Sequence, residues 1–375
     1  MDLTLDDDQT AIAELAGRIL TDTLAPGRVR ELEAEPDWFA GDTWRELARA
    51  DLLGVCLPEV DDGGGYGIEE ACLMLEQVGR TVAPVPLFAT LVLGAMPIAQ
   101  FGTDEQRAVY LPSVIAGDLV LSAALVEPGW PEPPAVPATV ATPDGDGWRL
   151  DGEKVFVPSG HLAGHLLVPA RTGDGATTVF LVEAAADGVG LERQVATNLE
   201  PFPTLRMDGV AVGPGDVLGE IDEGAAVVAW ITERAVAGLC ATSAGVCEAA
   251  LRITATYTSE RHQFNAPIAT FQAVAQRMAD AYIDTEAVRL TARQAAWLLA
   301  RGEPAAEALA VAKVWAAEGG QRVAHAALHL HGGIGVDVDY PVHRHFRWAK
   351  HLELSLGGAT HHLLKLGARL ADAPV

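Results

Sequence analysis

The chain has 375 residues, which is long for one hydrophobic core and indicates two or three domains. Hydrophobic residues make up 49% of it and charged residues 21%, the balance of an ordinary globular protein. The formal net charge of −25 argues against a nucleic-acid-binding protein, because such binding rests on clustered lysine and arginine.

Neither the cysteines nor the N-terminal residues point to an extracellular or membrane protein. The four cysteines form no CxxC pair or regular framework, which is typical of small buried residues in a reducing compartment. The first residues, MDLTLDDDQ, are acidic where a signal peptide would be basic and then apolar. Residues 82–101 carry no charge, but three prolines and a glycine interrupt them, which favours a buried helix over a membrane span. We expect a soluble, cytoplasmic protein.

Residues 1–117 are predicted to form a helical domain. Apolar positions Ile12, Leu15 and Ile19 recur at helical spacing, and the segment IEEACLMLEQVGR at 68–80 repeats the pattern. Thr103 stands before acidic residues, as a helix N-cap does.

Residues 118–222 have a different texture, dense in proline and glycine. Short runs such as HLLVPA and TTVFLVEA are typical of strands, and TPDGDG separates two such runs as a turn does. We predict a small antiparallel sheet domain.

Residues 223–375 are predicted to form a four-helix bundle. The first helix ends at Arg261, the second covers FQAVAQRMADAYIDTEAVRLTARQAAWLLARG, and the third starts at Pro304 and ends with Gly332 as its C-cap. The fourth covers residues 341–367, where the glycine pair at 357–358 bends or interrupts it. The predicted fold class is mainly α with a central β domain.

One acidic and one basic residue stand side by side in the apolar first bundle helix. Glu233 and Arg234 are sequence neighbours, so on a helix they do not face one another. Burying a carboxylate raises its proton affinity and suits it to act as a base. The alternative is a structural glutamate bonded to a neighbouring helix end or to an arginine elsewhere.

Other motifs favour ordinary structure. DDGGGYG at 61–67 lacks the spacing of a dinucleotide-binding loop, and its aspartates would repel phosphate. His325 and His329 have the i, i+4 spacing of metal ligands, but no cysteine partners or HExxH pattern accompany them. There is no GxSxG sequence, which leaves nucleophilic hydrolysis with little support.

Two segments of the bundle are suited to bind an anionic ligand. In ERHQFNAPIATFQAV, Arg261 leaves the end of a long helix and can clamp a phosphate. In HLHGGIGVDVDYPVHR, paired glycines let the backbone approach a ligand closely.

Together these segments resemble the acyl-CoA dehydrogenase family over nearly the whole chain. RHQFNAPIATFQAVAQRMAD looks like its R-x-x-F-G-x-x-I…F-Q signature, and HLHGGIG…YPVHRHFR looks like its second signature. The domain order, the opening MDLTLDDDQ and LVEPG at 125–129 also fit.

The resemblance implies FAD-dependent α,β-desaturation of an acyl-CoA thioester. A carboxylate removes the α-proton, the flavin accepts the β-hydride, and electrons pass to an electron-transferring flavoprotein. Such chemistry needs an apolar, water-poor cleft. The family's flavin lies between two subunits, so the resemblance also implies a dimer or tetramer, homo- or hetero-oligomeric.

The resemblance assigns cofactor-binding residues on two sides of the flavin. In the bundle, Asn265 replaces the usual glycine and His329 the common glutamine, while the other matching residues are Arg261, Phe264, Phe271, Gln272, Gly332 and Gly333. In the β domain the matching positions hold Leu125, Val126, Phe156 and Pro158. Val126 and Pro158 replace threonines, Phe156 replaces a tryptophan, and a Gly-Ser-Asp element is absent, so hydroxyl and backbone donors are lost on this side.

The resemblance leaves the base open. Leu356 stands at the glutamate of the family's Y-E-G-T motif, and an ungapped count from Arg261 puts the alternative base position at Ala235, two residues after Glu233. Two residues turn a helix by roughly 200°. Two hypotheses follow: an active dehydrogenase with Glu233 as base, or a non-catalytic partner subunit that completes the flavin site of another chain.

Overall fold

A computed structural model describes residues 2–372. The chain divides into two compact units, each assembled from separate segments. The first, here called the bundle unit, contains the chain up to Gly27, the segment Cys72–Ala83 and the chain from Val236 onward. The second, the sheet unit, contains Arg28–Ala71 and Pro84–Ala235.

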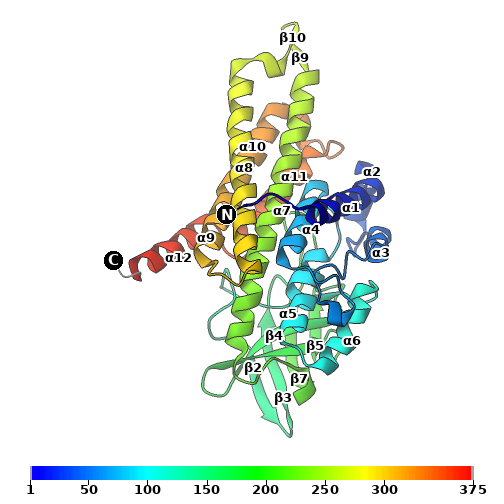
Figure 1. The fold of residues 1–375 in the computed structure, drawn as a ribbon, viewed down its shortest axis with the longest axis vertical. Coiled ribbons are helices and arrows are strands. Elements are labelled where there is room, and N and C mark those ends of the chain that lie inside the picture. The colour runs from blue at the N-terminus through cyan, green and yellow to red at the C-terminus, as the bar shows by residue number, and fades with distance from the viewer. Residues whose placement is uncertain (1, 373–375) are drawn as a thin grey trace. The chain divides into compact units, whose positions relative to one another are not determined.

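Long helices make up the bundle unit, with a two-strand hairpin at the tip of two of them (Figure 1). Helices α4 and α7 each have residues in both units. The elements are α1 (Asp7–Thr23), α4 (Ile68–Thr81), α7 (Gly224–Glu260), β9 (His262–Gln263), β10 (Ala266–Pro267), η4 (Ile268–Thr270), α8 (Gln272–Ala300), α9 (Ala306–Val314), η5 (Trp315–Gly319), α10 (Gly320–His331), η6 (Gly332–Val336), α11 (Val342–Leu354) and α12 (Ala359–Asp372).

The four predicted bundle helices are present, with two interruptions. The third begins at Ala306 rather than at Pro304, and the π-helical turn η5 divides it into α9 and α10. Gly332 caps α10 with φ 63°, a conformation that glycine adopts without strain. The fourth helix stops at Leu354 and restarts at Ala359, so the glycine pair interrupts it.

Helix α1 forms for the reasons that its sequence indicates. The Asp6 side chain accepts a hydrogen bond from the Gln9 amide, and the Gln9 side chain accepts one from the Asp6 amide, which completes a capping box. Ile12, Ala16 and Leu20 are buried along one face at helical spacing.

Two glycines allow α4 and α7 to cross in close contact. A Cβ on Gly245 would lie 1.8 Å from the Glu76 carbonyl oxygen, and one on Gly79 would lie 2.0 Å from the Thr242 carbonyl oxygen. No larger residue fits at either position without separating the helices.

Beside this crossing lies a partly buried cluster of charges. Arg80 pairs with Glu248, and Arg289 contacts both Glu76, at 3.3 Å, and Glu248, at 3.4 Å. The guanidinium groups of Arg80 and Arg289 outweigh the burial of Glu248 and hold the pKa of its carboxyl below the usual value.

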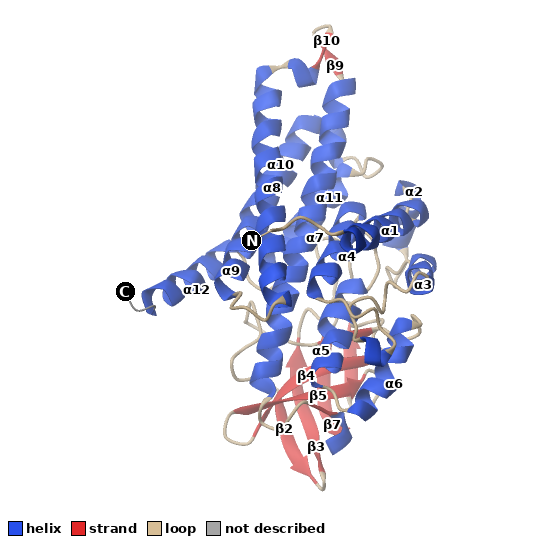
Figure 2. Ribbon diagram, in the orientation of Figure 1, coloured by secondary structure: helices blue, strands red, loops and turns tan. Residues whose placement is uncertain are grey.

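The sheet unit combines short helices with one sheet, which Figure 2 shows in red. Its elements are α2 (Pro26–Ala34), α3 (Gly41–Arg49), η1 (Glu59–Asp61), η2 (Phe88–Ala95), α5 (Met96–Phe101), α6 (Asp104–Ile115), β1 (Leu121–Ala123), β2 (Val140–Asp144), β3 (Gly147–Lys154), β4 (His165–Thr172), β5 (Ala176–Glu183), β6 (Val189–Glu192), β7 (Thr204–Val212), η3 (Pro214–Asp216) and β8 (Val217–Leu218). Thr103 caps α6 as predicted.

The sheet is mixed, where the sequence predicts an antiparallel one. Its order is β6-β7-β3-β2-β4-β5-β8, and β1 pairs with β4. The pairs β1–β4 and β2–β4 are parallel, whereas β2–β3, β3–β7, β4–β5 and β6–β7 are antiparallel. The parallel pair β2–β4 arises because a ten-residue connection, 155–164, carries the chain from β3 past β2 to β4.

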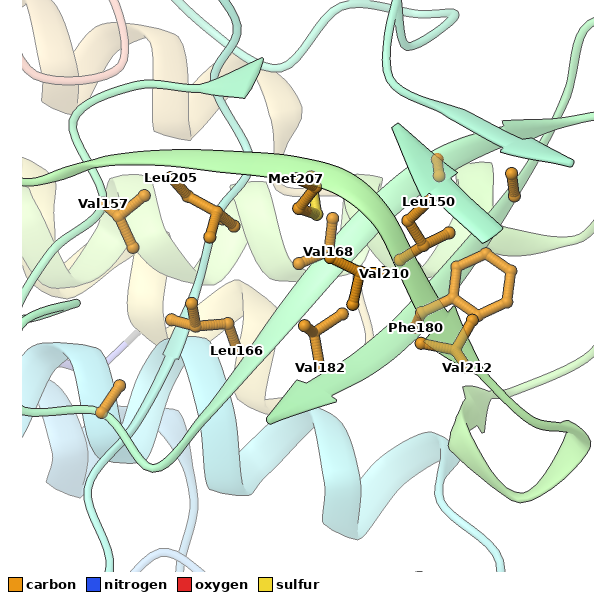
Figure 3. Close-up of a cluster of buried hydrophobic side chains, with 14 of the residues drawn as sticks. Leu150, Val157, Leu166, Val168, Phe180, Val182, Leu205, Met207, Val210 and Val212 are labelled. Carbon is orange, nitrogen blue, oxygen red and sulfur yellow. The ribbon is translucent and has the colours of Figure 1, made fainter. Parts of the chain in front are cut away.

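One cluster of apolar side chains forms the core of the sheet. Figure 3 shows side chains from β3, β4, β5 and β7 converging on one another. Leu150, Leu166, Val168, Phe180 and Val210 are fully buried in it. Alternate residues of neighbouring strands supply this core, as the pleat of a sheet requires.

All four cysteines are free and buried, as predicted. The apolar segment 82–101 forms η2 and α5, whose residues Ala89–Ile98 are buried, so it is the expected core helix. In the described part of the chain, α7 is the one helix long and apolar enough to cross a membrane, and 83% of its most apolar window is buried inside the protein.

Candidate functional site

The connection between α7 and α8 holds three of the predicted cofactor residues, Arg261, Phe264 and Phe271, and the fourth, Gln272, is the first residue of α8. The connection is a hairpin in which Gln263 pairs with Ala266 across a two-residue turn. Phe264 is 91% exposed, and its ring meets that of Phe271 edge to face at 6.2 Å. This hairpin therefore presents an aromatic ring at the surface, where a ligand or another chain can contact it.

Both turn residues have positive φ, 52° at Phe264 and 65° at Asn265. Asparagine tolerates this conformation, but a bulky side chain such as phenylalanine adopts it at a cost of roughly 1–2 kcal/mol. Backbone strain that holds an exposed aromatic ring in place is typical of a binding element.

The end of α10 and the segment after it hold the other three bundle residues. His329 lies in the last turn of α10, and Gly332 and Gly333 follow it, all three exposed. A Cβ on either glycine would meet no atom within 4 Å, so their backbone is open to a ligand. The Tyr257 hydroxyl, one turn before Arg261, donates to the His331 carbonyl at 3.4 Å and brings this segment to the same end of the bundle as the hairpin.

The four β-domain residues lie together in the sheet unit. Leu125 is buried, and the Val126 carbonyl accepts a hydrogen bond from the Val155 amide at 2.9 Å. Phe156 is 60% exposed with φ 53°. The Pro158 carbonyl accepts a hydrogen bond from the Ser122 hydroxyl at 2.5 Å.

A buried ion pair anchors this region, and sequence reasoning does not single it out. Lys154 donates to Glu127 at 2.8 Å, with 0% and 2% of the two side chains exposed. Glu127 also accepts from the amides of Ala138 and Thr139, so it joins both ends of the loop 128–138. Lys154 and hydrogen bonds hold the pKa of Glu127 below its usual value despite burial. A lysine directly before the apolar run Val155–Val157, at the end of a strand, is the signal that could have found Lys154.

The Glu233–Arg234 pair does not form a salt bridge with itself. The Arg234 guanidinium stacks on the Trp230 ring, 3.6 Å from its centroid, and donates to the Trp230 carbonyl at 3.2 Å. Burial lowers the pKa of Arg234 to about 10, an effect that the charge of Glu233 partly opposes. The side chain of Glu233 is half-buried and makes no hydrogen bond or ion pair with any of residues 2–372.

Leu356 lies in a turn that buried polar groups build. The Lys313 ammonium, fully buried, donates to the carbonyls of Leu352 at 2.9 Å and Glu353 at 3.1 Å, which end α11. Burial lowers the pKa of Lys313 to about 8. The His362 ring donates from Nε2 to the Leu356 carbonyl at 2.9 Å, and Leu356 has φ 51°.

Metal ligands do not gather in the part of the chain that the structure describes: no three His, Cys, Asp or Glu residues there are placed to hold an ion. The His325 ring instead meets Phe346 edge to face at 5.0 Å.

The bundle side fits the flavin that the resemblance implies. Exposed Arg261 offers a cation, Phe264 a ring, and Gly332 and Gly333 open backbone.

The β-domain edge fits a flavin less well. The amides of Val155 and Val157 donate to the carbonyls of Val126 and Pro203, and Pro158 has no N–H. Within residues 155–158 of the described chain, only the Phe156 amide remains for a ligand. The β-domain residues therefore provide few donors for the edge of an isoalloxazine ring.

Known proteins resemble this chain from end to end. Residues 6–118 match the family "Acyl-CoA dehydrogenase, N-terminal domain" and residues 222–371 match "Acyl-CoA dehydrogenase, C-terminal domain". Acyl-CoA dehydrogenase FadE27 of Mycobacterium tuberculosis is 37% identical over 100% of both chains.

Two solved structures share the fold over nearly their whole length. A variant of the "Tcur3481-Tcur3483 steroid ACAD" is 45% identical, with TM-score 0.91 over 98% of this chain and 99% of that one. The ChsE4-ChsE5 complex from Mycobacterium tuberculosis is 38% identical, with TM-score 0.94 over 100% of both. Helical domains around a central mixed sheet are thus the fold of this chain's relatives as well. The chain belongs to the acyl-CoA dehydrogenase family, oxidoreductases that act on CH–CH bonds with FAD as cofactor.

Proposed function

We propose that this chain is the base-free subunit of a hetero-oligomeric acyl-CoA dehydrogenase and that it completes the flavin site of a second chain of the same family. The observation that carries the proposal is the absence of a carboxylate at both base positions, which hold Leu356 and Ala235. FAD held at this shared site would supply the acceptor for the β-hydride of the acyl-CoA thioester, and an electron-transferring flavoprotein would receive the electrons.

The continuity of α7 supports this reading over a catalytic role for Glu233. Glu233 could serve only if a bulge or a shifted helix start moved it onto the face of Ala235. Helix α7 is α-helical from Gly224 to Glu260 without a π turn, unlike the segments η2 and η5. Ala235 is fully buried and Glu233 only half-buried, as expected for residues roughly 200° apart on one helix.

The distribution of binding groups also supports a shared site. The bundle side keeps Arg261, the projecting Phe264 and the open glycines, whereas the β-domain edge of this chain has few free donors. A subunit that contributes its bundle residues to the flavin site of another chain, and holds no flavin on its own β domain, is expected to keep the bundle groups and lose the β-domain donors. Two of the similar solved structures carry the names of two proteins, in line with a two-chain assembly.

The substrate that we propose is a CoA thioester with a steroid-type acyl group, oxidised in the cytoplasm as part of lipid breakdown. Its support is the "steroid ACAD" that is 45% identical over 98% of this chain. The base and the β-domain contacts to FAD come from the second chain.

The test is expression of this chain alone and together with a homologue encoded beside it. We expect the isolated chain to be colourless or unstable, and the co-purified complex to show the visible absorbance of bound flavin. Stoichiometric flavin in the isolated chain would refute the proposal.

A second candidate is an active homo-oligomer with Glu233 as base, which the unpaired, half-buried Glu233 carboxylate favours among the described residues. Exchanging Glu233→Gln in the flavin-bound enzyme, whether that is the two-chain complex or the isolated chain, separates the two. Under the base-free proposal, dye reduction by acyl-CoA stays at the level of the control Glu303→Gln, an exposed loop residue. Under the second candidate, dye reduction is abolished while FAD stays bound.

A further inference from the structure

The loop that carries the glycine pair folds back on the helix that precedes it. Gly335 lies so close to the last turn of α10 that an added Cβ would be 3.0 Å from the Leu328 carbonyl oxygen and 3.1 Å from the Cβ of His331. The side chains of Val336 and Val338 point away from the fold, 71% and 60% exposed. The loop thus has a defined, compact path that turns its backbone and apolar side chains outward.

Two hydrogen bonds hold the His331 ring at the base of this loop. His331 is 3% exposed, and its Nδ1 lies 2.7 Å from the Ala327 carbonyl oxygen, which can only accept. Nδ1 therefore carries the proton, and Nε2 accepts from the Tyr340 hydroxyl at 3.2 Å. Burial lowers the pKa of His331, which keeps the ring in this neutral form.

Tyr340 closes the far end of the loop. Its ring packs against the apolar cluster that includes Ala327 and Val342, and its carbonyl accepts a hydrogen bond from His343 at 2.7 Å. The hydrogen bond between His331 and Tyr340 therefore joins the two ends of the loop that contains Gly332 and Gly333.

Tyr257 connects the same histidine to the hairpin. Its ring stacks on that of His331, with centroids 4.4 Å apart, and its hydroxyl donates to the His331 carbonyl. Tyr257 lies one helical turn before Arg261, whose amide donates to the Tyr257 carbonyl at 2.8 Å. One buried imidazole thus contacts Tyr340 at the end of the glycine loop and, through Tyr257, is connected to Arg261 at the start of the hairpin.

We propose that His331 and Tyr340 are positioning residues for FAD, which fix the Gly332–Asp339 loop in the conformation that receives the cofactor at the shared site. The proposal rests on the proposed function, because the flavin concerned is the one that this chain helps a second chain to bind. The neighbouring core is apolar and rich in alanine, so an apolar pair would serve burial equally well. Hydrogen bonds add direction, which an apolar contact does not supply.

The experiment measures FAD affinity of the flavin-stripped two-chain complex by quenching of flavin fluorescence. Tyr340→Phe removes one oxygen atom and is expected to weaken FAD binding by about threefold to tenfold, the effect of one hydrogen bond. The matched control is Tyr110→Phe in the sheet unit, where the hydroxyl forms no hydrogen bond with the described residues. We expect it to leave FAD affinity unchanged.

Two substitutions of His331 separate positioning from space filling. His331→Gln keeps a donor and an acceptor and is expected to retain most of the affinity for FAD. His331→Leu keeps the volume and loses both hydrogen bonds, and this variant is expected to bind FAD about tenfold more weakly or worse. A role in packing alone predicts that Leu binds FAD at least as well as Gln.

Hydrogen exchange of residues 332–340 in the flavin-free complex gives a second readout. We expect faster exchange in Tyr340→Phe than in the wild type, with the thermal midpoint nearly unchanged. Wild-type affinity and wild-type loop exchange in both Tyr340→Phe and His331→Leu would overturn the inference. If the wild-type complex itself takes up no FAD, the proposed function fails and this inference with it. That result can be told apart from a failure of the inference alone, in which the wild-type complex binds FAD and the variants bind it equally well.

Discussion

The crossing of α4 and α7 makes Gly245→Ala the sharpest test of the packing described above. A methyl group there would start 1.8 Å from the Glu76 carbonyl oxygen, and real Cβ contacts are essentially never below 3.0 Å, so the two helices must separate by more than 1 Å. The atom that it meets belongs to the backbone, which no side-chain rotation can move aside. Separation would also pull apart the charge cluster around Glu76 and Glu248.

Overpacking of this kind costs about 1–3 kcal/mol or more, against which alanine returns about 1 kcal/mol of helix propensity. Because the clash is with backbone, we expect a cost at the upper end of this range and a net loss of about 2 kcal/mol, or roughly 4–8 °C in the thermal midpoint. The matched control is Gly367→Ala in α12, also helical but with no atom within 4 Å of its Cβ, which should be neutral or slightly stabilising. Circular dichroism melting of the two variants decides, and a Gly245→Ala midpoint within about 2 °C of the wild type would refute the reasoning.

Three further predictions concern single side chains. Lys154→Met leaves the buried Glu127 carboxylate without its cation and should cost about 3–5 kcal/mol in urea unfolding; a midpoint equal to the wild type would show that the pair adds nothing. Phe264→Ala, at a 91% exposed position, should leave the thermal midpoint unchanged and reduce flavin in the two-chain complex, and full flavin content would count against a role for this ring. Burial lowers the pKa of His362 to about 4 from 6.5, so the unfolded chain binds the proton more tightly and stability falls as pH drops from 6.5 toward 4. His362→Gln cannot titrate and should reduce this acid loss in melts at about pH 7 and about pH 5; an unchanged loss would exclude His362 as its source.

Local signals in the sequence predict the helices well. The capping residue Thr103 and the C-cap Gly332 act within one or two turns, and both are found in the structure. The glycine pair at 357–358 ends a helix for the same local reason. On α1 the buried face is Ile12, Ala16 and Leu20, whereas the predicted positions Leu15 and Ile19 are only partly buried. Strand direction is different, because it depends on which strands pair after the chain has crossed the sheet. The parallel pairing of β4 with β1 and β2 could therefore not be predicted from the sequence.

In the candidate site, too, local features could be predicted from the sequence and long-range contacts could not. Arg261 and the glycine segment can be found from the sequence because their motifs are short and contiguous. The bond between His331 and Tyr340 cannot, because it depends on how a loop folds back on a helix. The register of Glu233 could be counted but not decided, since a single π turn would have changed it, and such turns do occur in η2 and η5.

The discontinuous make-up of the bundle unit has a consequence for the chain as it is made on the ribosome. The residues up to Gly27 belong to the same unit as the segment Cys72–Ala83 and the chain from Val236 onward. Helix α4 is an early partner of α1, because a Cβ on Gly17 would lie 2.9 Å from the Gln77 side chain. The remaining helices of the unit follow only after about 150 further residues, which takes on the order of 10–30 s at roughly 5–20 residues per second. During this time α1 and α4 lack most of their unit, so the nascent chain is expected to depend on chaperones, and a fragment truncated before Val236 is expected to aggregate.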